Sequence, residues 1–348
     1  MLDNLRLIWR YGPIQLMKLE KFYQNVLHHF VKIYDLLEAG EGYGSVSEML
    51  VAMNPEFIKL TQTSLNDHLT VNVDLDEQLV KDLVSVATKF NYGQLPADVH
   101  SFVGAVALIG FDKQLWAVQG GNYKVAECAL KLSKASINRR KVAKISKVGQ
   151  KFQVDGESEE LFDALIVAAP LTKDKSDLEF DGFDEEIILH GSYHRTISTV
   201  VQGELNLTAL GIHSSDLQTS HYFLLSPTFP VWSVEKMTPV DFSDDDEDGL
   251  KPVFRLFSHT PVDEDFLQTI FLEINEVSRT SWLAYPHYVV QQSLENFQLS
   301  PGLFYINSIE MAASAMEMSV LGARNVVNLI KKNYFAANEP SFSSKTEL

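Results

Sequence analysis

The 348 residues are too many for one ordinary hydrophobic core and favour two interleaved lobes. Hydrophobic residues make up 45% of the chain and charged residues 22%, which is the composition of a folded globular protein. The formal net charge of −17 disfavours nucleic acid as a partner, because an acidic surface repels a phosphate backbone.

Two further features of the composition limit the possible sites. Part of the acidic charge lies in one run, Asp244 to Asp248, which indicates a solvated loop because no EF-hand spacing surrounds it. The single cysteine, Cys128, excludes an internal disulfide and a multi-cysteine metal site, and we expect it to be a buried apolar residue. We therefore expect no metal. The longest apolar stretch, residues 102–111, is too short to form a transmembrane segment.

The first third of the chain has the periodicity of helices. From Gln15 to Ala39, apolar residues recur every three or four positions, and Gly40 is suited to end that helix. Ser45 and Glu48 fit a capping box that opens a short helix. Further helices are expected over 76–90 and 97–109.

The pattern then changes to short strands. A strand over 115–118, the pair Gly120-Gly121 and a helix over 124–132 are followed by a hairpin that turns at Gly149-Gln150. The apolar run 165–170 predicts a strand that is covered on both faces and ended by proline. Residues 190–290 predict a mixed antiparallel sheet, with strands over 196–204, 221–225 and 253–258. A buried strand over 303–307 and a helix over 314–331 are expected to close the fold.

Two of these corners could hold a cofactor. Gly120, Gly121 and Asn122 precede a helix, where glycines permit close backbone approach and the helix N-terminus favours an anion. A simple tight turn explains the same glycines equally well. Later in the chain, Glu310 lies between a strand and a helix, followed by the small residues Ala312 and Ala313. Such an acid can accept hydrogen bonds from ribose hydroxyls, although a helix-capping glutamate is the simpler interpretation.

An aromatic block is the third candidate. Trp282, Tyr285, His287 and Tyr288 lie within seven residues and could line a pocket for a planar or apolar ligand. The alternative is an aromatic core strand that ends at Pro286. There is no nucleophile elbow, metal motif or Walker loop, so the catalytic residues remain unknown from the sequence.

These segments together resemble the prenylcysteine oxidase (prenylcysteine lyase) family, which is related to the amine-oxidase-like flavoproteins. The resemblance runs along nearly the whole chain, and its most specific parts are the blocks Trp282–Tyr288 and Ile309–Met318. Other matching segments are 8–12, 91–94, 102–106, 115–122, 166–171 and 203–206; the family usually has Glu in place of Gln119.

The resemblance implies an α/β (α+β) fold in which an FAD-binding lobe is interleaved with a helical and antiparallel-sheet substrate lobe. The implied order is a helical substrate lobe (1–111), an FAD-lobe segment with the glycine turn, hairpin and strand (112–185), and an antiparallel-sheet substrate lobe (186–299). The closing FAD-lobe strand and helix (300–335) and a loose tail (336–348) complete it.

The resemblance also implies the chemistry. The flavin N5 of FAD would take a hydride from the carbon between the sulfur and the first alkene of a farnesyl- or geranylgeranyl-cysteine. Water addition would then release cysteine and a prenyl aldehyde, and oxygen would reoxidise the flavin to give hydrogen peroxide. Glu310 and the glycine turn would lie near the cofactor, and the aromatic block would help to hold the isoprenoid.

The family further implies a glycan at the sequon Asn206-Leu207-Thr208 and a luminal, lysosomal location. The family's signal peptide and its strand–GxGxxG–helix unit, the first βαβ unit, do not occur in these 348 residues. We expect either an incomplete gene model or splice form of a working oxidase, or a truncated non-catalytic relative that acts as a binding protein. An amine-oxidase-like enzyme for another substrate is a third possibility. Without that unit, one edge of the central sheet should be exposed.

Overall fold

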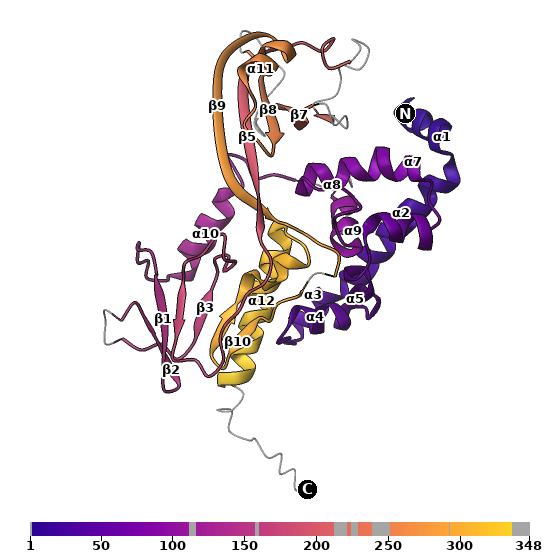
Figure 1. The fold of residues 1–348 in the computed structure, drawn as a ribbon. Helices are drawn as coiled ribbons and strands as arrows, with labels where there is room; N and C mark the ends of the chain where they lie inside the picture. The colour runs from indigo at the N-terminus through magenta and orange to yellow at the C-terminus, as the bar shows by residue number, and fades with distance from the viewer. Residues whose placement is uncertain are drawn as a thin grey trace.

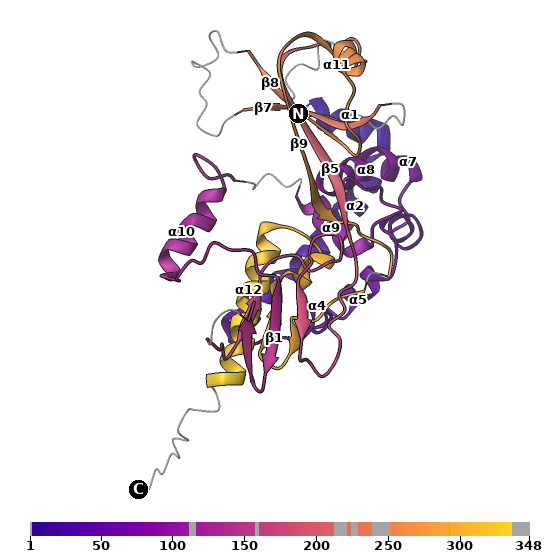
Figure 2. The ribbon, with the colours of Figure 1, turned by 60° about the vertical axis from the view of Figure 1, so that its left-hand side comes forward.

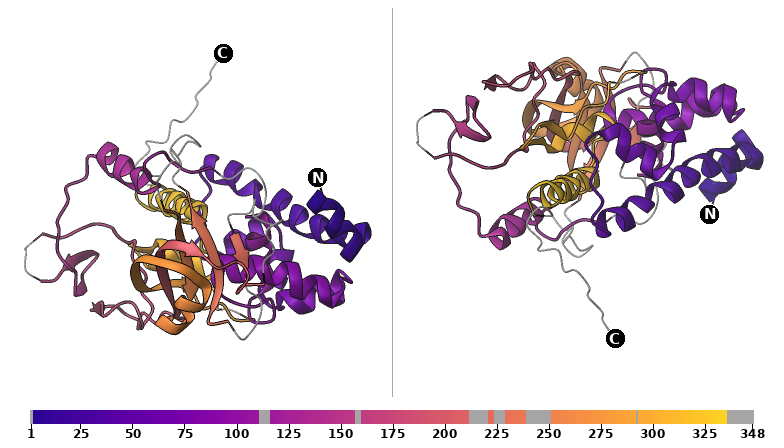
Figure 3. Two further views of the ribbon diagram at one scale, coloured as in Figure 1. Left: turned by 90° about the horizontal axis from the view of Figure 1, so that it is seen from above. Right: turned by 90° about the horizontal axis from the view of Figure 1, so that it is seen from below.

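The computed structural model describes residues 2–110, 116–156, 160–211, 221–223, 229–238, 251–291 and 293–335. The acidic run 244–248 and the tail 336–348 lie outside the described residues. The C-terminal helix α12 (Met316–Ile330) has the helices of residues 2–110 on one side and most of the segment 116–185 on the other (Figure 3). A larger sheet stands above α12, and its two long strands, β5 (Tyr193–Leu205) and β9 (Phe271–Pro286), run down toward this helix (Figure 1).

The helical part contains nine α-helices and two π-helical turns in its described residues. The helix expected over 15–39 is two helices, because the chain bends at Val31. Gly40 has a φ of +86° just after the second of them, and the predicted capping box of Ser45 and Glu48 is confirmed. The bounds are α1 (Leu2–Tyr11), α2 (Pro13–Phe30), α3 (Lys32–Glu38), α4 (Val46–Met53), α5 (Glu56–Thr61), α6 (Leu65–Asp67), α7 (Glu77–Leu79), α8 (Ser85–Tyr92) and α9 (Ser101–Ile109), with π turns at His68–Asn72 and Val80–Val84.

Helix α9 is the centre of the helical core. It begins four residues later than expected, at Ser101 directly after the N-cap His100, and most of its residues are buried. A Cβ at Gly104 would lie 2.4 Å from Leu65 Cδ2, so the glycine permits the close packing of α6 on α9. This explains on packing grounds why Gly-Ala-Val-rich sequence occurs here.

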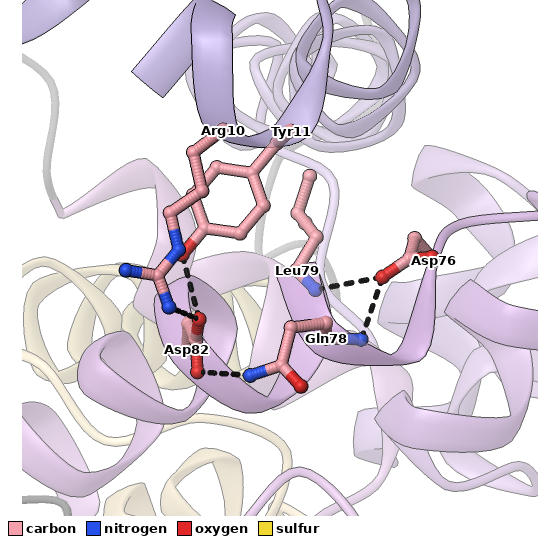
Figure 4. Close-up of polar contacts among 6 residues, drawn as sticks. All are labelled: Arg10, Tyr11, Asp76, Gln78, Leu79 and Asp82. Carbon is pink, nitrogen blue, oxygen red and sulfur yellow. Dashed lines mark hydrogen bonds and ion pairs between the residues drawn. The ribbon is translucent and has the colours of Figure 1, made fainter. Parts of the chain in front are cut away.

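The first helix is attached to the rest of the core by a polar cluster around Asp82 (Figure 4). Arg10 Nη2 and the Tyr11 hydroxyl donate to Asp82 Oδ2 at 2.6 and 2.8 Å, and Gln78 Nε2 donates to Asp82 Oδ1 at 2.8 Å. Burial and the Asp82 carboxylate raise the pKa of Tyr11 to about 12. The family-like segment 8–12 therefore has a structural role in holding α1.

Two small sheets lie beside α12. The first has the order β2-β1-β4 and the second β10-β11-β3. Their bounds are β1 (Lys144–Val148), β2 (Lys151–Val154), β3 (Leu165–Val167), β4 (Glu179–Asp181), β10 (Gln298–Ser300) and β11 (Leu303–Tyr305). The hairpin at Gly149-Gln150 and the buried strand β11 are confirmed.

Strand β3 differs from the expectation that both of its faces are covered. Ile166 is 42% exposed, and Ala168 and Ala169 beyond the strand are exposed as well. Within the described residues β3 pairs only with β11, in parallel. Strand β3 is therefore an edge strand among the described residues, and its face at Ile166 is also uncovered.

The larger sheet has five antiparallel strands in the order β6-β7-β8-β5-β9. Their bounds are β5 (Tyr193–Leu205), β6 (His221–Phe223), β7 (Val231–Met237), β8 (Val253–Ser258) and β9 (Phe271–Pro286). Helix α11 (Glu264–Ile270) packs on one face through Leu267 and Ile270. The expected antiparallel sheet is confirmed, although β7 and most of β9 were not predicted.

Helix α12 connects the parts. A Cβ at Gly322 would lie 2.9 Å from the Ile306 carbonyl oxygen, so this glycine lets α12 approach the end of β11. On its other side, Asn328 Nδ2 donates to the carbonyls of Leu37 and Glu41 at 2.8 and 2.7 Å. No helix in the described part of the chain is long and apolar enough to span a membrane.

Candidate functional site

The late corner, residues 305–316 between β11 and α12, carries the acid that the sequence singled out. Glu310 lies in a 3₁₀ turn (Ile306–Met311) and is partly buried. The Tyr193 hydroxyl donates to one carboxylate oxygen, and Asn307 Nδ2 donates to the other at 3.0 Å. Burial first, and Glu310 second, raise the pKa of Tyr193 well above its ordinary value, so Tyr193 remains the donor. Glu310 is therefore a fixed acceptor rather than a helix cap.

The backbone of the late corner is held from the helical part. The Tyr288 and Tyr92 hydroxyls donate to the carbonyls of Glu310 and Ser314 at 3.0 and 3.3 Å. His100 Nε2 lies 3.4 Å from the Met311 carbonyl oxygen. These bonds come from three separate segments of the chain, so the corner is fixed by tertiary contacts.

The two alanines of the late corner and the start of α12 have different surroundings. Ala312 and Ala313 are fully buried, and their side chains pack into the helical core. Ala315 precedes α12 in an extended conformation, and no side chain caps the helix. The first-turn N–H groups of α12 thus lack a side-chain acceptor. The roles of Ala312 and Ala313 as cofactor contacts stay predictions.

The double-glycine corner, residues 118–124, has a different character. Gly120 and Gly121 have φ values of +78° and +115°, so the turn requires glycine. Asn122 Oδ1 accepts the Val118 N–H at 2.9 Å. No residue of the following helix α10 (Tyr123–Ser133) is buried, and Figure 2 shows this helix standing apart from α12.

Two expectations about this segment are wrong. Residues 116–118 do not form a strand, although residues 111–115 lie outside the described part of the chain. Cys128 is exposed rather than buried, because α10 has no packing partner among the described residues. The polar contacts recorded for Gly120, Gly121 and Asn122 are local and none reaches the late corner, so their cofactor role stays a prediction.

The aromatic block separates into a core part and a surface part. Tyr288 is fully buried and packs edge-on against Tyr92, with ring centroids 5.1 Å apart; Tyr285 meets the same Tyr92 ring at 6.0 Å. Burial raises the pKa of both Tyr285 and Tyr288. Trp282 is 38% exposed, and His287 is exposed. The interpretation as a core strand ended by proline therefore fits Tyr285 but not the exposed Trp282, and Tyr288 reaches the core from beyond the strand end at Pro286.

Trp282 belongs to a row of rings that crosses the larger sheet, which we call the aromatic row: Trp282, Phe257, Trp232 and His259. Successive centroids are 6.4, 6.2 and 4.4 Å apart, and Phe257 stacks on Trp232 with an interplanar angle of 16°. In the same sheet, Thr196 Oγ1 on β5 and Trp232 Nε1 and Ser233 Oγ on β7 are buried without a protein hydrogen-bond partner. Such unpaired polar atoms beside apolar rings are typical of a face that contacts a ligand or ordered water.

The row ends at a hollow of about 390 Å³, within the size range of small-molecule sites. We call it the basic hollow; it is lined by Lys89, Gly93, Gln94, Leu95, Asp98, His194, His259 and His287. The His194 ring centroid lies 5.4 Å from that of His259 and 6.4 Å from that of His287. Burial first, and His259 second, lower the pKa of His194, while the Tyr92 and Arg195 carbonyls oppose this shift.

Sequence reasoning missed most of the aromatic row and of the basic hollow. Their members come from α8, β5, β7, β8 and β9, so no short segment contains them. The sequence analysis singled out only the motif containing Gly93 and the block containing Trp282 and His287. It did not predict that these two segments lie at one site.

Comparisons with known proteins agree with this fold. A family model described as prenylcysteine lyase matches residues 1–341. "Prenylcysteine oxidase 1-like" proteins of Mus musculus and Homo sapiens are each 30% identical over 354 residues, covering 96% of this chain and 71% of the relative. "Prenylcysteine oxidase 1" of Homo sapiens is 29% identical over 349 residues, covering 94% and 68%.

A solved structure of putrescine oxidase bound to putrescine is similar with a TM-score of 0.56 and 13% identity. The similarity covers 92% of this chain and 76% of that chain, and at this identity it shows the fold alone. The expected amine-oxidase-like flavoprotein fold is confirmed.

Proposed function

Because the chain belongs to the prenylcysteine lyase family, we propose that it oxidises the thioether of farnesyl- or geranylgeranyl-cysteine with FAD as cofactor. The balanced reaction converts prenylcysteine, oxygen and water into cysteine, a prenyl aldehyde and hydrogen peroxide, in the degradation of prenylated proteins. The observation that carries the proposal is the family match over residues 1–341. No comparison favours a binding protein or an oxidase for another substrate over this reaction.

The late corner fits one end of a dinucleotide cofactor. Glu310 presents a partly buried carboxylate that Tyr193 and Asn307 hold in place, and such an acid can accept hydrogen bonds from sugar hydroxyls. The uncapped first turn of α12 offers N–H donors and the positive end of the helix dipole. We therefore assign Glu310 and the first turn of α12 as the residues that would hold the cofactor, with Tyr193 and Asn307 as positioning residues.

When bound, FAD supplies the hydride acceptor for the carbon between the sulfur and the first alkene. The protein's part is to bind, orient and exclude water. The aromatic row offers apolar ring atoms for an isoprenoid chain, and Trp282 at its exposed end lies where such a chain could enter, whereas Trp232 is buried. The buried ring of Tyr92 contacts Tyr285, and its hydroxyl donates to the Ser314 carbonyl of the late corner.

The proposal extends to a luminal, lysosomal location with a glycan on Asn206. This residue follows β5 at a turn, where its Nδ2 donates to the Thr269 carbonyl at 3.3 Å. A glycosylated asparagine keeps one N–H, so the glycan would be compatible with that bond. A mobility shift on glycosidase treatment, absent from Asn206→Gln, would support the glycan; no shift would contradict it.

The experiment that tests the function is turnover of S-farnesyl-cysteine, with peroxide, cysteine and aldehyde measured together and putrescine as the comparison substrate. We expect a protein with visible flavin absorbance that releases one peroxide per cysteine. Tyr193→Phe, which removes the hydroxyl that holds Glu310, should lower the flavin content several-fold without unfolding the chain. Tyr123→Phe on the exposed helix α10 is the matched control.

Three results would contradict the proposal in different ways. A colourless, inactive protein would favour a binding function. A yellow protein that oxidises amines but not farnesylcysteine would favour an amine oxidase. Equal flavin content in Tyr193→Phe and Tyr123→Phe would remove the assignment of the late corner.

A further inference from the structure

The basic hollow differs in charge from the rest of the molecule. The chain carries a formal net charge of −17, yet the titratable lining of the hollow is one lysine and three histidines against a single carboxylate, Asp98. With the histidines counted as neutral, as in the net charge of the chain, Lys89 and Asp98 balance. The hollow is therefore a local exception to the acidic composition of the chain, and it offers one cation and several imidazole rings to an anionic group.

The basic groups of the hollow lack counter-ions in the described residues. Lys89 is half-buried, burial lowers its pKa, and no ion pair joins it to Asp98 or to another carboxylate of the described residues. Both ring nitrogens of His194 are buried without a well-formed hydrogen bond. An anion in the hollow would supply the missing partner, because charge-assisted bonds to Lys or His are stronger than neutral ones.

The backbone around the hollow is arranged so that these groups converge. Gly93 ends α8 with a φ of +68°, and a Cβ there would lie 2.9 Å from His194 Cε1. His259 Nε2 and Nδ1 lie 3.2 and 3.4 Å from the carbonyl oxygens of Gly93 and Arg195. A neutral ring donates to one of these carbonyls, and a protonated ring donates to both. The glycine therefore brings the end of α8 against the histidines.

The hollow is continuous with the aromatic row. His259 is both the last ring of the row, 4.4 Å from Trp232, and a wall of the hollow. His194 packs against Tyr285 with centroids 5.9 Å apart. A ligand that fills both places has an anionic end and a long apolar tail, which is the chemistry of a prenylated amino acid.

We propose that the basic hollow binds the α-carboxylate of the amino-acid end of the substrate, with Lys89 and His287 as its contacts and Asp98 facing the α-ammonium group. This inference rests on the proposed function, since it assigns the polar end of the same substrate. His194 and His259 are positioning residues that join the hollow to the aromatic row.

The test compares S-farnesyl-cysteine with its methyl ester, in which the carboxylate is masked, on the flavin-loaded chain. For the wild type we expect the KM of the ester to be about tenfold higher than that of the acid, the size of one charge-assisted bond. Lys89→Met and His287→Gln should each raise the KM of the acid about tenfold and leave the KM of the ester and kcat nearly unchanged. Lys81→Met, an exposed lysine on the preceding π turn, is the control and should change neither.

A second readout separates this inference from the function itself. Calorimetric titration with S-dodecyl-cysteine and its methyl ester measures binding without the alkene that promotes oxidation. Carboxylate-dependent binding that Lys89→Met abolishes supports the hollow, even if farnesylcysteine is not oxidised. Normal oxidation with equal affinity for acid and ester overturns the hollow and leaves the function standing. As a folding control, Lys89→Met and His287→Gln must melt within a few degrees of the wild type. If either variant raised the KM of the acid and of the ester equally, the assignment of the hollow would be overturned.

Discussion

The late corner and the double-glycine corner look alike in the sequence but differ in the structure. Each places small or acidic residues before a helix, as expected for a cofactor-binding turn. In the structure, Tyr92, Tyr193 and Tyr288 from other segments bond to the late corner. The double-glycine corner is held by bonds within its own turn, and its helix α10 has no buried residue. Long-range partners, rather than the local motif, therefore distinguish a built site from a turn.

The largest expected effect comes from replacing one tyrosine that contacts the late corner and one that follows the double-glycine corner. Tyr288→Ala removes a fully buried ring that packs on Tyr92 and donates to the Glu310 carbonyl, so we expect a loss of about 3–5 kcal/mol in the free energy of unfolding. Tyr123→Ala, at a side chain that is 61% exposed on α10, should change it by less than about 0.5 kcal/mol. Urea unfolding of both variants measures the difference. Similar losses would mean that α10 is packed as firmly as the late corner.

The contrast also shows how far the sequence could predict the molecule. Apolar periodicity predicted most of the described helices, the hairpin at Gly149 and strand β8, because local pattern and burial agree there. It missed most of β9, whose residues are largely exposed and show no regular alternation of burial. It joined α2 to α3, since the apolar repeat continues through the bend at Val31.

The candidate site was less predictable than the fold. Glu310 was identified from its position between a strand and a helix, but its partner Tyr193 is 117 residues earlier in the chain. The basic hollow is lined by residues as distant in sequence as Lys89 and His287. A pattern of neighbouring residues does not show which distant segments lie together in the fold. Cys128 was expected to be buried because a lone cysteine in a helical segment is usually an apolar core residue, yet no described surface covers α10 and Cys128 is exposed.

The second test uses pH, because the late corner contacts a buried histidine and the double-glycine corner does not. His100 is fully buried; its Nδ1 accepts the Val103 N–H at 3.2 Å, so the ring proton is on Nε2, facing the Met311 carbonyl. Burial lowers its pKa from 6.5 to about 4, against the smaller opposing effect of that carbonyl. Between those values the unfolded chain binds a proton that the folded chain does not. Stability should therefore be complete above pH 6.5 and fall by about 3 kcal/mol as the pH drops to about 4.

The matched variant is His100→Asn, which keeps an N-cap acceptor for α9 but cannot take up the proton. It should be less stable than the wild type at neutral pH, because the ring packed 5.7 Å from Tyr288 is lost, but it should lack most of the decline between pH 6.5 and 4. His28→Asn, at an exposed histidine of α2, should retain the wild-type decline. Urea unfolding at pH 7 and pH 4.5 gives both values, and an unchanged slope in His100→Asn would assign the acid sensitivity to other groups.

The smallest expected change in the free energy of unfolding is for a substitution on α10. It tests whether the apolar side of this helix is exposed to solvent. Leu132 is 80% exposed in the last turn of the helix, where a lysine would interact favourably with the helix dipole. Leu132→Lys should therefore change the free energy of unfolding by no more than about 0.5 kcal/mol. A loss of about 1.5–3 kcal/mol would instead be the cost of exposing a buried leucine, and it would mean that a surface covers this side in solution. Leu132→Ala removes the same apolar area without adding charge, so a loss shared by both variants would identify packing rather than charge as the cause.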